Sequence, residues 1–339
     1  MEYKQENGVV TKSSPANIAI VKYWGKRAVQ LPLNPSISFS LKNCITTTKI
    51  KYTLNKELND YSFNFLFENK SNSKFEEKLL QFFKRIDHFI PWLKHFHLNI
   101  ESSNTFPHSS GIASSASSYS ALAKALAEIH LQITGVTLPQ TVVSEFARLG
   151  SGSACRSTQE GWNIWGDSSF EGSNDQYALE INPLVHESFM SIQDTVLIVS
   201  NQQKAISSTK GHQLMENHPY KEARIQQANK NTIQLIEALK NGDWDLFIEI
   251  AELEALSLHG LMMSSSPGYT LLLPNSLTII SKIREFRASS KIPVCFTIDA
   301  GPNIHVLYPE SNKNEVLEFI ERDLKKYCIN NLLIKDSIA

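Results

Sequence analysis

The chain has 339 residues, with 33 Lys and Arg against 34 Asp and Glu, and 42% of its residues are hydrophobic. At roughly 150 residues per domain, this length predicts about two domains and excludes a small disulfide-stapled scaffold. The formal net charge of −1 excludes a global positive field that would attract nucleic acid or an anionic membrane, so an anionic ligand has to be bound locally. The composition also excludes disorder as the dominant state.

Four cysteines are spaced too far apart for a disulfide framework or a zinc site: Cys44, Cys155, Cys295 and Cys328. This usage favours a reducing cytoplasm as the location. The first residues are acids and amides where a signal peptide needs an apolar segment, and no run reaches the roughly 18 apolar residues of a membrane span. We therefore expect a cytoplasmic protein without a membrane or nucleic-acid partner.

The first hundred residues are expected to be mainly strands, because they are rich in Ile, Val, Thr and aromatic residues and several stretches alternate with period two. These strands are predicted at 17–24, 36–41, 44–54 and 61–67. Apolar residues at helical spacing predict a helix over 74–86 that covers a sheet. A helix is also predicted from Ile112 onward, and another over 138–149 that ends at Gly150.

A second block is expected after residue 188. It begins with a strand at 191–200 and continues with helices at 220–240 and 244–259, separated by Gly242 as a stop and Asp243 as an N-cap. Ser276 is expected to cap a helix that runs to Arg287. Strands at 294–298 and 304–308 then enclose a tight turn. The sequence therefore predicts an α+β protein with domains at 1–188 and 189–339.

The most informative polar segment is a small-residue loop at 107–116, Pro-His-Ser-Ser-Gly-Ile-Ala-Ser-Ser-Ala, which runs into an amphipathic helix. Backbone N–H groups at a helix N-terminus form an anion site, and small residues let a phosphate approach. A Ser-rich N-cap explains the pattern equally well. The loop is not a Walker A motif, because the Gly-Lys-Ser/Thr ending is missing.

Three further segments combine small and charged residues. Residues 17–27 place Lys22, Lys26 and Arg27 at the end of an apolar strand, which suits a multiply charged ligand or a solvated strand end. Residues 150–157, Gly-Ser-Gly-Ser-Ala-Cys-Arg-Ser, place a guanidinium in a small-residue turn, where it matches a carboxylate or phosphate. Residues 297–303 carry a lone carboxylate at a strand end, a position that local turn chemistry also favours.

Two features are set aside as sites. His95 and His97 share one side of a strand, but no third metal ligand is evident. Cys155 stands beside an arginine, yet the sequence offers no partner base for a cysteine nucleophile.

Together, segments 17–27, 107–116, 150–157, 207–211 and 299–303 resemble the signature segments of the diphosphomevalonate decarboxylase family. The family belongs to the galactokinase, homoserine kinase, mevalonate kinase and phosphomevalonate kinase superfamily. The resemblance runs from about residue 13 to 308, and Lys-Tyr-Trp-Gly-Lys and Gly-Ser-Gly-Ser-Ala-Cys-Arg are its most specific parts. It implies a ribosomal protein S5-like N-terminal domain, a ferredoxin-like C-terminal domain and an active site in the cleft between them.

The resemblance implies ATP-dependent decarboxylation of mevalonate 5-diphosphate to isopentenyl diphosphate, ADP, phosphate and CO2, with Mg2+ as cofactor, in a homodimer. By likeness, Asp299 would take or orient the proton of the substrate hydroxyl. Arg156 and Asn17 would hold the C1 carboxylate, and Lys22 would lie near the reacting centre. The substrate diphosphate would be bound by Tyr23, Lys26, Ser151 and Ser153, and the transferred phosphoryl group would lie close to Ser208. The ATP phosphates would be bound by Asn104, Ser109, Gly111, Ala113, Ser114 and Ser115, with Ser115 also a ligand of Mg2+.

The sequence departs from the usual family pattern at Pro35, at 108–110 and at His212. A related decarboxylase or kinase that acts on mevalonate 5-phosphate or mevalonate therefore stays an alternative. A catalytically inactive ligand-binding homologue is a remote alternative, because Asp299, Arg156 and Lys22 are all present.

Overall fold

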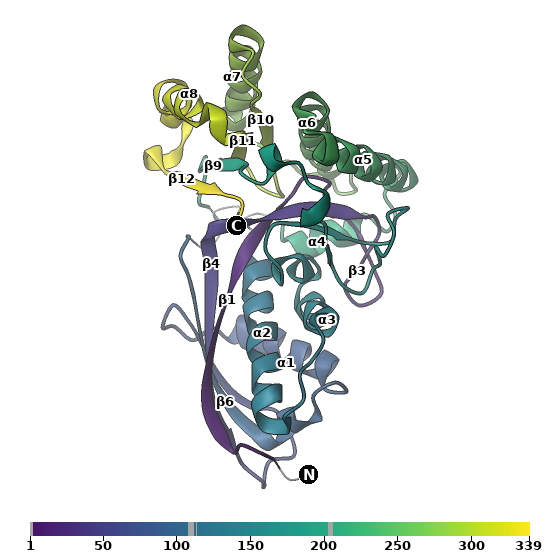
Figure 1. Ribbon diagram of the computed structural model, residues 1–339, viewed down its shortest axis with the longest axis vertical. Helices are drawn as coiled ribbons and strands as arrows, with labels where there is room; N and C mark the ends of the chain where they lie inside the picture. Colours follow the sequence, from purple (N-terminus) through teal and green to yellow (C-terminus); the bar gives the residue numbers. More distant parts are fainter. Residues whose placement is uncertain (1–2, 108–111, 113, 203–205) are drawn as a thin grey trace.

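The computed structural model describes residues 3–107, 112, 114–202 and 206–339. Its described strands form a six-stranded sheet, a four-stranded sheet and a two-stranded ribbon, with helices packed against the two larger sheets (Figure 1). The expected α+β class is confirmed. None of the described helices is both long and apolar enough to cross a membrane.

The larger sheet is built almost entirely from the first half of the chain. It consists of β1 (Asn7–Ala19), β4 (Ser36–Leu54), β5 (Ser62–Phe67), β6 (Phe96–Asn104), β7 (Trp162–Trp165) and β8 (Leu179–Glu180). The order is β5-β6-β4-β7-β8, and β1 pairs with the long central strand β4. The β5–β6 pair is parallel and the others are antiparallel. The two-stranded ribbon is formed by β2 (Lys26–Arg27) and β3 (Leu31–Pro32).

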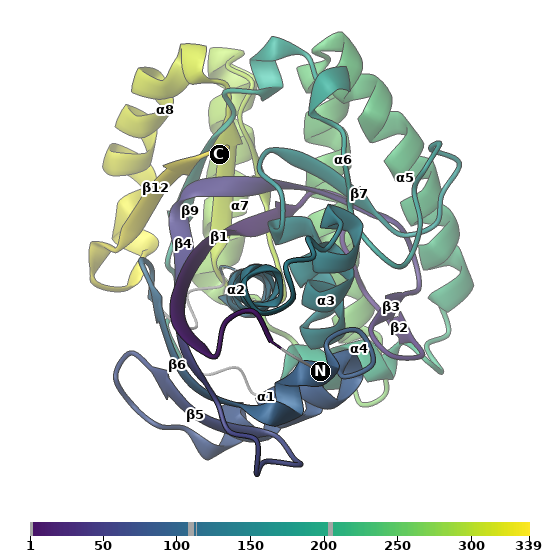
Figure 2. The same ribbon diagram turned by 60° about the horizontal axis from the view of Figure 1, so that its bottom comes forward.

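Three helices fill the concave side of this sheet, and Figure 2 shows the strands curving around the middle one. They are α1 (Ser73–Ile86), α2 (Ser114–Thr134) and α3 (Gln140–Gly150). The apolar stripe expected for α1 is confirmed, since Leu79, Phe82 and Phe83 are buried in the core beneath the sheet. Asn72 caps α1 by accepting the backbone N–H of Lys74.

Three strand predictions in the first block were wrong in extent. The two strands expected at 36–41 and 44–54 are one strand, β4, because β1 pairs with it over nearly its whole length and absorbs an irregularity between Pro15 and Asn17. The strand expected at 17–24 instead belongs to β1, which ends at Ala19. Beyond that point the backbone leaves the sheet and enters the loop that carries Lys22.

The second half of the chain forms the smaller sheet and its helices. The sheet consists of β9 (Gln193–Leu197), β10 (Cys295–Thr297), β11 (Ile304–Tyr308) and β12 (Leu333–Ser337), in the antiparallel order β10-β11-β9-β12. The helices are α4 (Ser208–Leu214), α5 (Lys221–Asn241), α6 (Trp244–Met263), α7 (Pro274–Ser290) and α8 (Lys313–Phe319). The expected strand 304–308 is confirmed, whereas those at 191–200 and 294–298 are shorter than expected.

The residues predicted to end α5 and to cap the start of α6 do so. Gly242 ends α5 with a φ of 70°, a left-handed conformation that glycine adopts without strain, and the Asp243 side chain accepts the N–H of Leu246 at 3.0 Å. Ser276 contributes to the start of α7, although it is not the N-cap residue as expected, because α7 begins at Pro274 and Leu273 is the N-cap. Its hydroxyl accepts the N–H of Leu273, as the third helical residue does in a capping box, and donates to the carbonyl of Pro302.

The two halves of the chain pack against each other. One hydrophobic cluster combines residues of β1 and β4 with residues of β9, α5 and α6. The chain finally returns to the larger sheet, where Asp336 of β12 accepts the N–H groups of Asn43 and Cys44.

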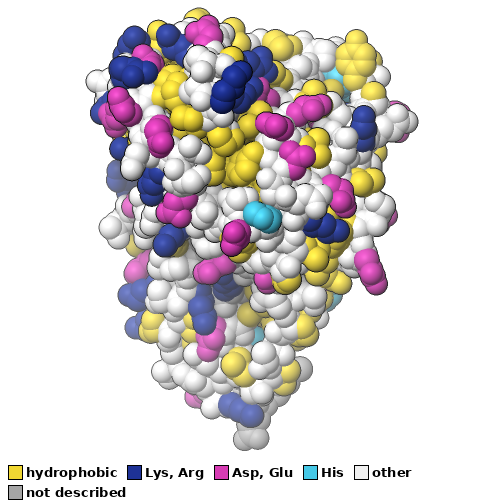
Figure 3. Space-filling view, turned by 45° about the horizontal axis from the view of Figure 1, so that its top comes forward, with side chains coloured by type: hydrophobic (Ala, Val, Ile, Leu, Met, Phe, Trp, Pro, Cys, Tyr) yellow, Lys and Arg dark blue, Asp and Glu magenta, His cyan; other side chains and the backbone are white. Residues whose placement is uncertain are grey.

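On the face drawn in Figure 3, basic and acidic side chains are interspersed. A domain boundary near residue 188 stays a prediction.

Candidate active site

A cavity of about 440 Å3 lies where the loop after β1, the 3-10 helix Gly152–Ser157, and the N-terminal ends of α2 and α4 meet. Its lining includes the expected residues Asn17, Lys22, Tyr23, Lys26, Ser114, Ser115, Ser151, Ser153, Arg156, Ser208 and Asp299. Polar segments from distant parts of the sequence therefore face one space.

Four of the residues expected at the ATP phosphates are not in this group. Ser109, Gly111 and Ala113 lie outside the described residues. Asn104 lies at the end of β6, where its side-chain oxygen accepts a hydrogen bond from Thr46 at 2.8 Å. The described lining of the cavity does not include Asn104.

The cavity contains a lysine–aspartate ion pair. Lys22 Nζ donates to Asp299 Oδ1 at 2.7 Å and to the carbonyl of Ala19 at 2.6 Å. The lysine side chain is 2% exposed, whereas that of Asp299 is 25% exposed. The carboxylate is therefore held by a buried cation on one side and remains accessible from the cavity.

Asp299 is kept ionised by its surroundings. Burial alone would raise its pKa, but Lys22 and, at longer range, His305 and Arg156 outweigh that effect, so the pKa is lowered from its ordinary value. At neutral pH Asp299 is therefore an acceptor for a hydroxyl proton. Its place immediately after β10, in the turn before β11, presents it at the edge of the smaller sheet.

Arg156 is buried in the wall of the same cavity. Its Nη1 donates to Ser36 Oγ, and its guanidinium lies 5.9 Å from the ring centroid of Trp165. Its Nε is buried without a hydrogen-bond partner among the described residues. An arginine cannot lose its charge in a protein, so this buried cation favours an anionic partner.

Two neighbouring residues also have unsatisfied polar atoms. Asn17 donates to Ser157 Oγ at 2.7 Å and to the carbonyl of Ser153 at 3.1 Å, but its Oδ1 accepts nothing from the described residues. The hydroxyl of Tyr23 is likewise buried and unpartnered within the described chain. These atoms and Arg156 Nε are therefore available to a polar ligand in the cavity.

Tyr23 occupies its place because the facing residue has no side chain. A Cβ on Gly152 would come within 2.6 Å of the Tyr23 hydroxyl oxygen. The ring of Tyr23 packs edge-on against Trp165, with the ring centroids 4.8 Å apart. The small residues of the Gly-Ser-Gly-Ser segment therefore admit the tyrosine as well as a ligand.

Lys26 is the first residue of β2, and its Nζ donates to Gln30 Oε1 at 2.6 Å. Burial and the positive charge of Arg85 lower its pKa to about 8. The lysine is therefore only partly protonated near pH 8, and an anionic ligand would restore its charge.

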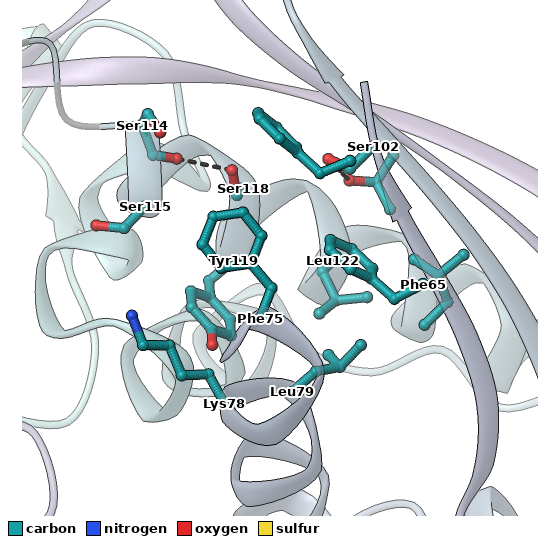
Figure 4. A pocket seen from close by; sticks show the side chains of 13 residues that line it. Phe65, Phe75, Lys78, Leu79, Ser102, Ser114, Ser115, Ser118, Tyr119 and Leu122 are labelled. Atoms are coloured by element: carbon teal, nitrogen blue, oxygen red, sulfur yellow. Dashed lines mark hydrogen bonds between the residues drawn. The ribbon is translucent and has the colours of Figure 1, made fainter. Parts of the chain in front are cut away.

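A second, apolar cavity of about 130 Å3 adjoins the first, and both are lined by Phe75, Lys78, Ser114 and Ser115. In Figure 4, the side chains of Phe65, Phe75, Tyr119 and Leu122 surround this space, and Ser114 and Ser115 stand at one end of it. An apolar chamber thus opens beside the polar one at the start of α2.

Several lining residues were missed by sequence reasoning, namely Trp24, Phe75, Lys78, Ile112, Thr209, His212, Leu258 and Ala300. Lys78 lies one turn after Phe75 on the amphipathic helix α1, where a lysine indicates only a solvated face. His212 was noticed as a departure from the family pattern. Its Nδ1 accepts the N–H of Gly25 at 2.9 Å, and burial, together with Lys26, keeps its pKa well below the ordinary value.

The features set aside on the sequence have structural partners. His95 Nδ1 is bonded to the hydroxyl of Tyr3, and His97 Nδ1 to Ser62 Oγ at 2.7 Å. Burial raises the pKa of the Cys155 thiol to about 12, so it is a thiol at neutral pH.

The chain is similar to known proteins over nearly its whole length. Residues 14–178 match the family model of the diphosphomevalonate decarboxylase-like N-terminal domain, and residues 195–336 match that of the mevalonate 5-diphosphate decarboxylase C-terminal domain. A diphosphomevalonate decarboxylase from Debaryomyces hansenii is 30% identical over 329 residues, which covers 93% of this chain and 83% of that protein.

Solved structures extend this similarity to the fold. The mevalonate diphosphate decarboxylase from Staphylococcus aureus matches with a TM-score of 0.83 at 27% identity, covering 98% of this chain and 96% of that one. The structure of MDDEF in complex with MVAPP, AMPPCP and magnesium has a TM-score of 0.82 at 27% identity, covering 97% of each chain. Both halves of the fold are included in these matches.

Proposed function

This chain belongs to the diphosphomevalonate decarboxylase family, and from that membership we propose how its own residues carry out the reaction. The reaction is the ATP-dependent decarboxylation of mevalonate 5-diphosphate, which yields isopentenyl diphosphate, ADP, phosphate and CO2. The observation that carries our assignment is the ion pair between Lys22 and Asp299 at 2.7 Å, in a cavity that Arg156 also lines.

The first chemical step makes the tertiary C3 hydroxyl a good leaving group. The hydroxyl oxygen attacks the γ-phosphorus of ATP, ADP leaves, and the hydroxyl proton passes to Asp299 or is oriented by it. The lowered pKa of Asp299 keeps the carboxylate ionised for this contact. Lys22 holds that carboxylate in place and offers positive charge beside the transferred group, because phosphoryl transfer depends mainly on positioning and charge neutralisation.

The second step releases CO2. Departure of phosphate breaks the C3–O bond and builds positive charge at C3, and the electron pair of the C1–C2 bond then forms the C2–C3 double bond. Arg156 holds the C1 carboxylate through its unpartnered Nε donor, which lies in the wall of the cavity. Asn17 lies beside it in the same wall and can contact the carboxylate only through its Nδ2 donor group, because Oδ1 is an acceptor. The fork of the guanidinium matches the two carboxylate oxygens.

Tyr23, Lys26, Ser151 and Ser153 bind the substrate diphosphate. The tyrosine hydroxyl is a buried donor without a partner within the described chain, and Lys26 gains full charge when an anion approaches. The hydroxyl oxygens of Ser151 and Ser115 are 3.4 Å apart, so the substrate and nucleotide parts of the cavity meet there.

ATP lies across the two adjoining cavities. The apolar cavity between α1 and the sheet receives adenine, and the phosphates extend past Ser114, Ser115 and Lys78 toward Ser208 in the polar one. When bound, Mg2+ would neutralise charge on the ATP phosphates, and the hydroxyl of Ser115, which lines the polar cavity, would be its protein ligand.

The substrate assignment is tested by parallel assays of ADP and CO2 release with mevalonate, its 5-phosphate and its 5-diphosphate. Each charge-assisted hydrogen bond contributes about 1.5–3 kcal/mol, so we expect the 5-phosphate to be worse by at least about tenfold in kcat/KM. ADP and CO2 should appear in equal amounts. Equal turnover of the 5-phosphate would move the protein to the related branch that uses a monophosphate.

The pKa of Lys26 predicts a pH-dependent KM for the diphosphate substrate. Lys26 is protonated below about pH 8 and neutral above it, so KM should be lowest below pH 8 and rise above it. Replacing Lys26 by Met should raise KM at neutral pH and flatten this rise, while the KM for ATP changes little. A wild-type KM that is constant between pH 7 and pH 9 would contradict the role of Lys26.

A homodimer and a cytoplasmic location are further proposals. All four cysteines are buried and free, which agrees with a reducing compartment. Sedimentation equilibrium of the purified protein tests the homodimer directly.

A further inference from the structure

A buried ion pair joins α5 and α6 behind the active-site loop. Arg224 donates to both carboxylate oxygens of Glu254, at 2.7 Å to Oε1 and 2.6 Å to Oε2, and both side chains are at most 2% exposed. Asn231 donates to Oε1 at 2.6 Å. None of the three belongs to the described lining of the cavity, so their effect on the reaction has to pass through another residue.

That residue is Lys22, whose backbone is held by the pair on both sides. Its N–H donates to Glu254 Oε2 at 2.8 Å, and its carbonyl accepts from Arg224 Nη2 at 2.8 Å. Asn34 Nδ2 donates to the same carbonyl at 3.0 Å. Since β1 ends at Ala19, these side chains take the place of sheet partners for a residue that has left the sheet.

We propose that Glu254 and Arg224 are positioning residues that fix the backbone of Lys22 so that its ammonium group meets Asp299. The inference rests on the proposed roles of Lys22 and Asp299. A buried ion pair often stabilises a fold no better than apolar residues of similar volume, but it has one geometry. Here that geometry sets where the lysine side chain begins, and a misplacement of about 1 Å near reacting atoms can lower a rate about 10²-fold.

The proposal predicts a specific kinetic signature for Glu254→Gln and Arg224→Lys. The glutamine cannot accept all four hydrogen bonds of the carboxylate, and the lysine cannot bridge Glu254 and the Lys22 carbonyl in the same way. In both variants kcat should fall about tenfold or more, while the KM values for ATP and substrate change by less than about threefold. Steady-state kinetics with both substrates measures this.

The pH profile adds a readout that a purely structural role would not move. The titratable and charged groups around Asp299 are Lys22, Arg156, His259, His305 and Asp194. If Lys22 is displaced, Asp299 loses part of the attraction that lowers its pKa, so the acidic limb of kcat/KM should move to higher pH. The wild-type profile, measured alongside, gives the reference.

Glu252, on the same helix as Glu254, and Arg287 of α7 provide matched controls. Glu252 accepts from Arg287 at 2.6 Å, and Arg287 also donates to the carbonyl of Val294 at 2.7 Å. Glu252→Gln and Arg287→Lys should therefore lower thermal stability without changing kcat or the acidic limb by more than about twofold, since neither residue belongs to the described cavity lining.

The folding and the kinetics of these variants decide whether Glu254 and Arg224 position Lys22 or only stabilise the fold. If Glu254→Gln does not fold, Arg224→Lys decides, because it retains the charge of the pair. Folded variants whose kcat and pH profile match those of the controls would overturn the proposal, and so would an Arg224→Lys variant that fails to fold while Arg287→Lys folds. Normal turnover by an Asp299→Asn variant would instead refute the proposed role of Asp299.

Discussion

Replacing Asp299 by Asn is expected to lower kcat by about 10²- to 10⁴-fold, the usual contribution of a positioned acid or base. The amide has nearly the same shape as the carboxylate but cannot take a proton, and it gives up the ion pair with Lys22 at 2.7 Å. Because Asp299 faces the hydroxyl rather than the diphosphate in our assignment, the Kd of the substrate should change little. Single-turnover kinetics and a binding titration measure the two quantities separately.

The ion pair between Lys94 and Asp87 provides a control, because breaking it removes a lysine–aspartate pair that lies outside the described cavity lining. Lys94 donates to Asp87 Oδ2, also at 2.7 Å, and neither residue belongs to the described lining of the cavity. Asp87→Asn should retain near-normal kcat. A near-normal kcat in Asp299→Asn itself would remove Asp299 from the reaction.

Arg156→Lys should lower kcat/KM by about 10- to 100-fold, although the charge is kept. The loss corresponds to a charge-assisted hydrogen bond of about 1.5–3 kcal/mol, because an ammonium group cannot reproduce the planar fork that matches a carboxylate. The buried guanidinium also contacts Ser36 and Trp165, and a lysine would leave part of that space empty. Steady-state kinetics with the 5-diphosphate measures the change.

An Arg148→Lys variant shows what the loss of a buried guanidinium does when no ligand contact is lost with it. Arg148 is equally buried and donates to the carbonyls of Gln176 and Val29, but it does not belong to the described cavity lining. Arg148→Lys should lower the melting temperature and leave kcat/KM within about threefold of the wild-type value. If Arg156→Lys behaves in the same way, Arg156 is structural.

Local chemistry made much of the fold predictable. The apolar stripe of α1, the end of α3 at Gly150, and the Gly242 and Asp243 signals between α5 and α6 each depend on neighbouring residues, so a short window of sequence contains them. The strand predictions were wrong where hydrogen bonding to a neighbouring strand decides how far a strand extends. Lys42 and Asn43 are exposed polar residues that indicate a break between two strands, yet β1 pairs with β4 on both sides of them.

The sequence by itself determined which short segments hold the polar chemistry, because small residues, a lone carboxylate and clustered cations stand out locally. Only the tertiary structure decided that Lys22 reaches Asp299, that Lys78 turns toward both cavities, and that Glu254 and Arg224 support the loop. These contacts join residues far apart in the chain, and a buried Glu254 on α6 has the same sequence signature as an exposed one. Its role depends on the partners that packing supplies, and packing is a property of the whole fold.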